Sequence, residues 1–441
     1  MSTVACPSSL GRSPAIGAAA AAVVLMLALG GVANASINVL HSFTGSNGTL
    51  SVPDGANPYG SLIAAGGTLY GMTSMGGTAD QGVVFSLPQT GGPLSVLHSF
   101  AGGSADGAYP DGSLTFSYNQ ATLYGLTSQG GSANDGVFFA VPATGGSETV
   151  YTSYTGSANG AAPAGALNNM GDTDFVGTAW AGGSHNAGSL LTYQTGIGSG
   201  FLSSYQYSFT GGSDGGNPHG TLAGSSGPTF YGTTANGGSA GLGVVFQWSW
   251  GTGSANNPPT VVHAFTGGTS DGASPLGSLL ISGSTLYGMT SAGGTLAGGG
   301  AGVIFSVPTA GGPDTVLHIF TGGTSDGADP QGALVQAGDG TLYGMTSAGG
   351  AYGDGIIFSI KPDGSAYQVL DSFDGTNGAN PYGDLLLVGS TLYGMTYNGG
   401  VHNLGVVFSF ATPEPATLSL LALGGLGLLA RRRRGVGAAA R

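Results

Sequence analysis

The sequence has 441 residues, of which 90 are glycine and only 6% are charged. The glycines follow no three-residue period, which excludes a collagen, and the 41% of hydrophobic residues argues against a disordered chain. Between residues 36 and 412 a single basic residue, Lys361, stands against nineteen acids, so we expect no nucleic-acid partner.

Residues 1–35 have the pattern of a secretory signal peptide. Arg12 supplies a basic start, residues 16–29 form an apolar segment, and small residues offer a cleavage site between Ala35 and Ser36. A membrane-spanning helix is the alternative, but the apolar segment is short and ends in small residues. The only cysteine of the chain, Cys6, lies within the expected signal peptide, so the exported protein must be held together without disulfides.

One run, Thr68–Gly77 (Thr-Leu-Tyr-Gly-Met-Thr-Ser-Met-Gly-Gly), returns with small changes along the chain. Its tyrosine position falls at residues 70, 124, 176, 231, 287, 343 and 393, so the steps are 54, 52, 55, 56, 56 and 50 residues. The third copy is the most altered, since residues 175–180 read Phe-Val-Gly-Thr-Ala-Trp. Seven copies at a nearly constant step indicate a repeat architecture.

Each repeat contains four short apolar runs, which in the first repeat are residues 39–43, 61–64, 68–74 and 83–87. Gly, Pro, Asn and Asp fill the segments between them, as is typical of turns between strands. Four strands per repeat match one propeller blade, whereas the coils of a β-helix, the alternative architecture, are much shorter. We therefore predict an all-β fold, a seven-bladed β-propeller of four-stranded antiparallel blades over residues 36–411.

Strand alternation places Tyr70 and Met72 on one face of the second strand and Gly71 on the other. We expect the tyrosine to pack between blades, and the glycine face to form a notch for the adjacent blade. Residues 39–43 precede the first inner strand, so we predict that they pair with residues 406–410. This pairing would complete blade seven and remove two exposed edges.

The C-terminal end combines three features, which are Pro413-Glu414-Pro415, an apolar stretch over residues 416–430, and Arg431, Arg432, Arg433 and Arg434. The apolar stretch would form a short anchor helix of about 22 Å, against a membrane core of about 30 Å, with its arginine end in the cytoplasm. Residues 412–434 resemble the PEP-CTERM sorting signal of Gram-negative bacteria, although Thr412 replaces the usual small apolar residue. Residues 435–441 remain as a tail.

The resemblance to a PEP-CTERM signal implies an exosortase-type processing enzyme as a partner and cleavage near Pro413–Pro415. It also implies a route from the inner membrane, with the repeats outside the cytoplasm, to the cell surface or an extracellular matrix. A plain C-terminal membrane anchor is the alternative, and in either case the repeats are exported.

The repeats themselves resemble the GloVer tandem repeat family, glycine-rich surface proteins with interchangeable C-terminal anchors. The resemblance covers residues 37–410 and is carried by the recurring Leu-Tyr-Gly-x-Thr, Gly-Val-Val-Phe-Ser and Val-Leu-His-Ser-Phe runs. It implies an architecture, and no activity follows from it.

Four histidines share one repeat position, which other repeats fill with Thr152, Tyr207 and Asp371. They are His41, His98, His263 and His318. Because several polar types replace one another there, we interpret the position as decoration of a strand. The sequence has no His-Glu-x-x-His and no phosphate-loop motif, so we expect no cofactor.

A catalytic site in a repeat protein should consist of residues that break the pattern. Asp172 and Asp174 break it in the third repeat, and Asp384 breaks it where other repeats have Ser or a small residue. All three tryptophans fall in repeats three and four, as Trp180, Trp248 and Trp250. Acids beside tryptophans would suit glycan cleavage. The alternative is that the aspartates form a turn and the tryptophans fill space in an irregular blade.

The loops from each outer strand to the next inner strand should share one rim of the ring with the loops between second and third strands. This rim would carry eleven of the eighteen aspartates, among them Asp54, Asp106, Asp111, Asp214, Asp271, Asp326 and Asp329. We interpret most of them as turn residues. The functional alternative is a set of weak, distributed Ca²⁺ sites, at Asp54, Asp106, Asp214, Asp271 and Asp326, that bridge acidic polysaccharide.

The sequence thus predicts an exported, non-catalytic surface or matrix protein that contacts extracellular polysaccharide or other surface components. The alternative, from another class, is a polysaccharide-active hydrolase or lyase that uses the acids of the third repeat or Asp384. Two carboxylates about 5–10 Å apart in one concave site would favour the enzyme.

Overall fold

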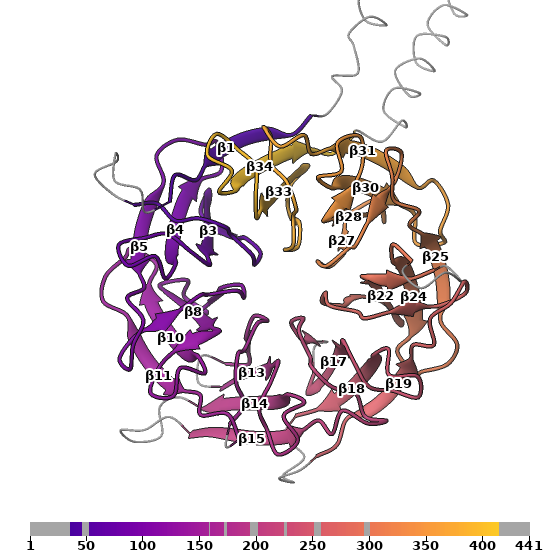
Figure 1. Cartoon of the computed structure of the whole chain (residues 1–441), viewed down its shortest axis with the longest axis horizontal. Coiled ribbons are helices and arrows are strands. Elements are labelled where there is room, and N and C mark those ends of the chain that lie inside the picture. The colour runs from indigo at the N-terminus through magenta and orange to yellow at the C-terminus, as the bar shows by residue number, and fades with distance from the viewer. Residues whose placement is uncertain are drawn as a thin grey trace, which may run out of the picture. The chain divides into compact units, whose positions relative to one another are not determined.

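The computed structural model describes residues 36–45, 53–157, 159–171, 174–194, 202–224, 227–250, 257–294 and 300–413. Across these residues the strands form seven four-stranded antiparallel sheets, arranged as the blades of a propeller around a central axis (Figure 1). The prediction of a seven-bladed propeller is therefore confirmed.

The strands of each blade run from the central axis outward. Blade 1 consists of β2 (Ile63–Ala65), β3 (Thr68–Thr73), β4 (Val83–Pro88) and β5 (Ser95–Ser99). Blade 2 consists of β7 (Thr115–Phe116), β8 (Thr122–Thr127), β10 (Val137–Pro142) and β11 (Thr149–Ser153). Blade 3 consists of β12 (Asn168–Asn169), β13 (Asp174–Ala179), β14 (Ser189–Gln194) and β15 (Leu202–Ser208). Blade 4 consists of β16 (Ala223–Gly224), β17 (Thr229–Thr234), β18 (Val244–Ser249) and β19 (Thr260–Ala264).

Blade 5 consists of β21 (Leu280–Ser282), β22 (Thr285–Thr290), β24 (Val303–Pro308) and β25 (Thr315–Ile319). Blade 6 consists of β27 (Val335–Gln336), β28 (Leu342–Thr346), β30 (Ile356–Ile360) and β31 (Gln368–Ser372). Blade 7 consists of β32 (Leu386–Val388), β33 (Thr391–Thr396), β34 (Val406–Ala411) and β1 (Asn38–Ser42).

Blade 7 is closed by the first strand of the described chain. Strand β1 pairs antiparallel with β34, with Asn38 opposite Ser409 and Ser42 opposite Val406 (Figure 1). Phe43, which follows β1, is fully buried against blades 7 and 1. The pairing expected for residues 39–43 is therefore present; it covers the edge that β34 would otherwise expose and makes β1 the outer strand of blade 7.

Short pairings join the loop that enters a blade to the loop between its second and third strands. The described pairs are β6 (Gly107–Ala108) with β9 (Gln129–Gly130), β20 (Gly272–Ala273) with β23 (Ala292–Gly293), and β26 (Gly327–Ala328) with β29 (Ala348–Gly349). The two sets of loops thus lie on one side of the ring, as expected, and this side is called the connection face below.

The hydrophobic core lies between blades. In the cluster between blades 7 and 1, Tyr393 and Met395 pack against Leu69 and Phe85. The expectation that the repeat tyrosine packs between blades is confirmed. The notch at the repeat glycine, however, is filled from within its own blade, because a Cβ atom on Gly71 would lie 2.7 Å from the Phe85 ring.

The inner strand is shorter than the predicted run 61–64, since β2 begins only at Ile63. The two residues before it have other tasks: Leu62 is buried in the core, and the Ser61 amide bonds to blade 2. At the outer edge, each outer pair contains a bulge one residue before the histidine position, so that Val84 faces His98 while Phe85 faces Val96. A bulge re-aims the side chain that follows it, here toward the loop of the connection face.

Candidate functional site

A frame of Pro-x-Gly, followed by one variable residue and Leu, leads into every inner strand. It occurs at residues 58–60, 110–112, 163–165, 218–220, 275–277, 330–332 and 381–383. The residue before the proline has a positive φ in all seven copies, between 48° and 59°. This shared backbone turn brings each segment to the channel in the same orientation.

The glycine of the frame is required by a close approach between blades. A Cβ atom on Gly60 would lie 2.0 Å from the Gly112 carbonyl oxygen, and one on Gly383 would lie 2.3 Å from that of Gly60. The seven glycines therefore form a tight ring around the channel. The space at this constriction is only about 40 Å³.

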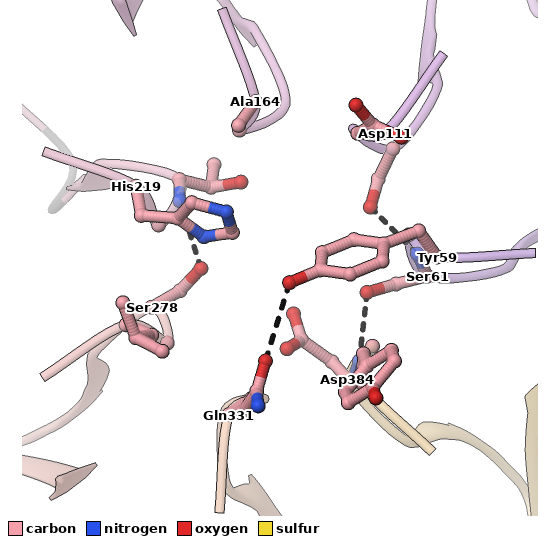
Figure 2. A pocket seen from close by; sticks show the side chains of 17 residues that line it. Tyr59, Ser61, Asp111, Ala164, His219, Ser278, Gln331 and Asp384 are labelled. Atoms are coloured by element: carbon pink, nitrogen blue, oxygen red, sulfur yellow. Dashed lines mark hydrogen bonds between the residues drawn. The ribbon is translucent and has the colours of Figure 1, made fainter. Parts of the chain in front are cut away.

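The middle residue of the frame varies among the blades, with tyrosine in both blade 1 and blade 7, and lines the channel next to the constriction (Figure 2). In chain order the seven residues are Tyr59, Asp111, Ala164, His219, Leu276, Gln331 and Tyr382. Together with residues that end the second strands they surround a cavity of about 680 Å³ on the connection face. A search for residues that interrupt the repeat misses these positions, because they vary while the proline and glycine on either side stay constant. The recurring Pro-x-Gly is the sequence signal that could have found them.

Aromatic side chains form an arc along one wall of this cavity. The ring of Tyr59 lies 4.9 Å from that of Tyr382, which lies 5.4 Å from Tyr397. Across the channel, His219 lies 6.0 Å from Tyr59 and 5.4 Å from Trp180. All five side chains are half-buried, so each ring keeps exposed surface toward the cavity.

The polar groups of the cavity are held by one another. Tyr59 donates a hydrogen bond to Gln331 Oε1 at 3.2 Å, and Gln331 Nε2 donates to Asp329 Oδ2 at 2.9 Å. Burial raises the pKa of Tyr59 to about 12 and raises the pKa of Asp111, while it lowers the pKa of His219. These shifts all disfavour the charged forms of Tyr59, Asp111 and His219, as burial of an ionisable group does.

Below the cavity, side-chain oxygens of the residue after the frame join neighbouring blades at five of the seven junctions in the described part of the chain. The described bonds run from Ser61 N to Ser113 Oγ, Ala166 N to Thr221 Oγ1, Thr221 N to Ser278 Oγ, Ala333 N to Asp384 Oδ1 and Asp384 N to Ser61 Oγ, at 2.6–2.9 Å. Asp384 thus takes the place of a hydroxyl in a structural belt, and burial raises the pKa of its carboxyl.

Asp174, the candidate acid of the third repeat that the structure describes, lies apart from the tryptophan at the channel. Asp174 begins β13, whereas Trp180 follows the other end of that strand, at the channel. Trp248 is buried in the core between blades 3 and 4. Asp174 and Trp180 are therefore held apart, because an extended strand separates its two ends; a catalytic role of the acids stays a prediction. Asp172 lies outside the described residues.

The five aspartates expected to form a calcium rim lie at the outer edge of the connection face, in five of the seven loops that enter the blades, and are engaged in turns. Asp54 accepts hydrogen bonds from the Thr44 amide at 2.9 Å and from His41 at 2.7 Å. Burial alone would raise the pKa of Asp54, but these bonds outweigh it and lower the pKa. Asp111 belongs to the central cavity instead. The calcium sites stay a prediction.

The histidine position is not mere decoration of a strand, since its side chain bonds to the loop residue that closes the turn. His98, His263 and His318 contact the carboxylates of Asp106, Asp271 and Asp326 at 3.3–3.4 Å. Where the strand residue is Tyr207, its hydroxyl donates to Asp214 at 2.9 Å. Where it is Thr152 or Asp371, the loop residue is Asn159 or Asn377, which caps the same turn. The loop residue is therefore Asp where the strand residue is His or Tyr, and Asn where it is Thr152 or Asp371.

Most of the expected processing and anchoring residues lie outside the described part of the chain. These are residues 1–35 with Ala35, and Glu414, Pro415 and the arginines at 431–434. Ser36 and Pro413 are the first and last residues of the described range. Among the described residues, no helix has the length and hydrophobicity needed to cross a membrane.

Two family models match the sequence. A family described as the Gloeobacter/Verrucomicrobia repeat matches residues 28–206 and 197–408. The PEP-CTERM protein-sorting motif matches residues 411–434. A search of curated proteins finds no match.

Solved structures with a similar fold are distant in sequence. A puromycin-hydrolyzing peptidase of Mycobacterium tuberculosis is 13% identical with a TM-score of 0.51, over 86% of this chain and 56% of that one. PorZ, a surface component of the type-IX secretion system of Porphyromonas gingivalis, is 13% identical with a TM-score of 0.51, over 80% and 46%. A Bacteroides uniformis protein provisionally identified as a 6-phosphogluconolactonase is 15% identical with a TM-score of 0.48, over 81% and 98%. Such similarity shows the fold alone.

Proposed function

The chain belongs to the Gloeobacter/Verrucomicrobia repeat family and carries a PEP-CTERM sorting motif. From this premise we propose that it is a surface protein that binds extracellular polysaccharide. The proposed binding site is the cavity on the connection face, called the channel mouth below. The motif marks the chain as exported and processed by an exosortase. The binding role is non-catalytic, and its ligand is a neutral glycan.

The observation that carries this proposal is the aromatic arc in the central cavity. The apolar C–H face of a sugar ring packs on an aromatic ring, while its hydroxyl groups bond to nearby polar side chains such as Gln331. The cavity, at about 680 Å³, falls in the range of roughly 300–1,000 Å³ that is typical of ligand sites. The net charge of −13 further disfavours an acidic glycan in the absence of a bridging cation.

The enzyme alternative has less support. Asp384 lines the constriction of about 40 Å³ and an adjoining cavity of about 370 Å³, but it is the only acid among the residues that line the larger cavity, and its carboxylate accepts the Ala333 amide. Asp174 lies at the far end of β13 from the channel residue Trp180. We therefore treat cleavage as an outcome to be tested and keep binding as the proposed function.

A glycan panel, scored for both binding and cleavage, tests this proposal with the full chain. We expect binding of a neutral glycan without cleavage, loss of binding in Trp180→Ala, and unchanged binding in Tyr352→Ala. Tyr352 is a suitable control because it is 68% exposed and lies outside the cavity. Binding that survives Trp180→Ala would contradict the proposed site, and cleavage products would favour the enzyme.

A further inference from the structure

At the outer edge of the connection face, the strand residue at the histidine position contacts a loop residue. At several blade junctions a third residue, from the next blade, joins this pair. This third residue stands four positions before the histidine position of its own blade. It lies against the residue that holds the histidine position in the preceding blade. At the junction of blades 5 and 6 this residue is Tyr367, whose ring stacks on His318 at 3.6 Å and whose hydroxyl donates to Asp326 at 2.6 Å. That junction is satisfied by its own hydrogen bonds.

At two other junctions the third partner is an acid. His98, Asp106 and Glu148, here called the first triad, join blades 1 and 2. His263, Asp271 and Asp314, called the second triad, join blades 4 and 5. Within each triad one nitrogen or oxygen atom from each residue lies within 4.8 Å of the other two.

The distances in the first triad fit the edges of a small coordination polyhedron. His98 Nε2 lies 3.3 Å from Asp106 Oδ1 and 3.2 Å from Glu148 Oε2. Ligand atoms at about 2.0–2.2 Å from a tetrahedral zinc ion stand about 3.3–3.6 Å apart. One Nε2–H can donate to only one acceptor at a time, so a proton on this atom cannot satisfy both carboxylates fully.

Each triad also contains a buried oxygen without a hydrogen-bond donor. Glu148 Oε1 has no partner although the Glu148 side chain is only 6% exposed. Asp314 Oδ2, at the equivalent position of the second triad, is likewise buried and without a partner. An unsatisfied buried carboxylate oxygen is costly, and its repetition at equivalent positions indicates that both sites accommodate a further ligand.

We propose that each triad binds one divalent transition-metal ion, with zinc as the expected ion. One imidazole nitrogen with two carboxylate oxygens is a donor set that zinc accepts, whereas calcium prefers oxygen ligands alone. The two carboxylates match the charge of the ion, and solvent can complete its coordination because the His98 side chain is 16% exposed.

The proposed ion would connect neighbouring blades. In the first triad, His98 and Asp106 belong to the end of blade 1, whereas Glu148 precedes the outer strand of blade 2. The Glu148 loop is already fixed on blade 1, because the Gly146 amide donates to the Leu97 carbonyl at 3.3 Å. A metal at this place would act as a cross-link between blades in an exported chain that has no disulfide.

Zinc titration of the full chain after treatment with EDTA tests this proposal by calorimetry. We expect two bound zinc ions per chain, one after Glu148→Leu and none after Glu148→Leu is combined with Asp314→Leu. Calcium chloride should not displace the zinc. Cobalt should give a visible absorption spectrum that halves in the single variant, which reports ligation independently of stability.

Two variants at equivalent positions serve as controls. Tyr367→Leu should leave the zinc stoichiometry unchanged, because its junction contains no second acid. Leu94→Glu should add a zinc site, since Leu94 holds the equivalent position beside His41 and Asp54, which lie 2.7 Å apart. The proposal would be overturned if the chain bound no zinc. It would also be overturned if neither Glu148→Leu nor Leu94→Glu changed the zinc stoichiometry. The triads would then be hydrogen-bonded contacts between histidine and carboxylates.

Discussion

The outer edge and the channel mouth of this propeller vary in different ways from blade to blade. At the outer edge the loop residue depends on the strand residue, since it is Asp214 opposite Tyr207, as opposite the histidines, but Asn377 where the strand residue is Asp371, so that the turn stays capped. At the channel mouth the middle residue of Pro-x-Gly changes alone, from Tyr59 to Ala164 to Leu276, within a constant frame. Paired change preserves structure, whereas unpaired change in a rigid frame leaves side chains available to a ligand.

Closure of the ring is common to both regions, and its loss should have the largest effect. Deletion of residues 36–44 would remove β1 and the fully buried Phe43, and would expose an edge of β34. We expect the free energy of unfolding to fall by more than about 4 kcal/mol, measured by urea titration. Asn38→Ala, at an exposed residue of β1, should change it little. Equal stabilities for the deletion and the wild type would contradict closure by β1.

The frame at the channel should be nearly as sensitive. In Gly60→Ala the new Cβ atom would lie 2.0 Å from the Gly112 carbonyl, so blades 1 and 2 must move apart. We expect a loss of about 3 kcal/mol or more. Gly338→Ala is the matched control, because a Cβ atom there has no neighbour within 4 Å. If both variants unfold at the same urea concentration, the glycine ring does not constrain the channel.

A single outer contact should matter less. Tyr367→Ala removes the stack on His318 and the hydrogen bond to Asp326, and we expect a loss of about 2 kcal/mol. Tyr352→Ala, at a side chain that is 68% exposed, should lie within about 0.5 kcal/mol of the wild type. Thermal melts of the two variants compare them directly, and a similar shift in both would show that the outer contact has no special role.

Acid should weaken the outer edge by a still smaller amount. Burial would raise the pKa of Asp326, but bonds from His318, Tyr367 and two backbone amides outweigh it and hold the pKa below the usual 3.8. The resulting stability is present above pH 3.8 and is lost as the pH falls below it. Asp326→Asn should therefore be less stable than the wild type at pH 6 and should lose less stability at pH 3. Parallel pH profiles for the two proteins would rule out this carboxylate as a source of acid sensitivity.

The fold could be predicted because its determinants are repeated. The Leu-Tyr-Gly run gave the blade period, and the position of residues 39–43 before the first inner strand gave the closure by β1. Individual contacts were harder to predict. The strand pattern predicted that the adjacent blade fills the notch at Gly71, whereas Phe85 of the same blade fills it.

The candidate site could not be predicted by searching for residues that break the repeat. That search selects Asp384, whose carboxylate replaces a hydroxyl in the belt between blades, and it overlooks Tyr382 two residues earlier. The link between His98 and Asp106 was also hidden, because it depends on a bulge that turns the strand residue toward the loop. Three-dimensional proximity distinguishes these roles, although the recurring Pro-x-Gly frame marks the channel positions in the sequence.

The most direct test of the proposed division compares two tyrosine-to-alanine variants in two measurements. Tyr382 lies at the channel mouth and Tyr367 at the outer edge, and both side chains are half-buried. For a glycan that the wild type binds, we expect Tyr382→Ala to weaken the affinity at least about tenfold, or 1.4 kcal/mol, with a smaller loss of stability than Tyr367→Ala. Tyr367→Ala should lower the stability and keep the affinity. Loss of affinity in both variants in proportion to their loss of stability would contradict a binding site at the channel mouth.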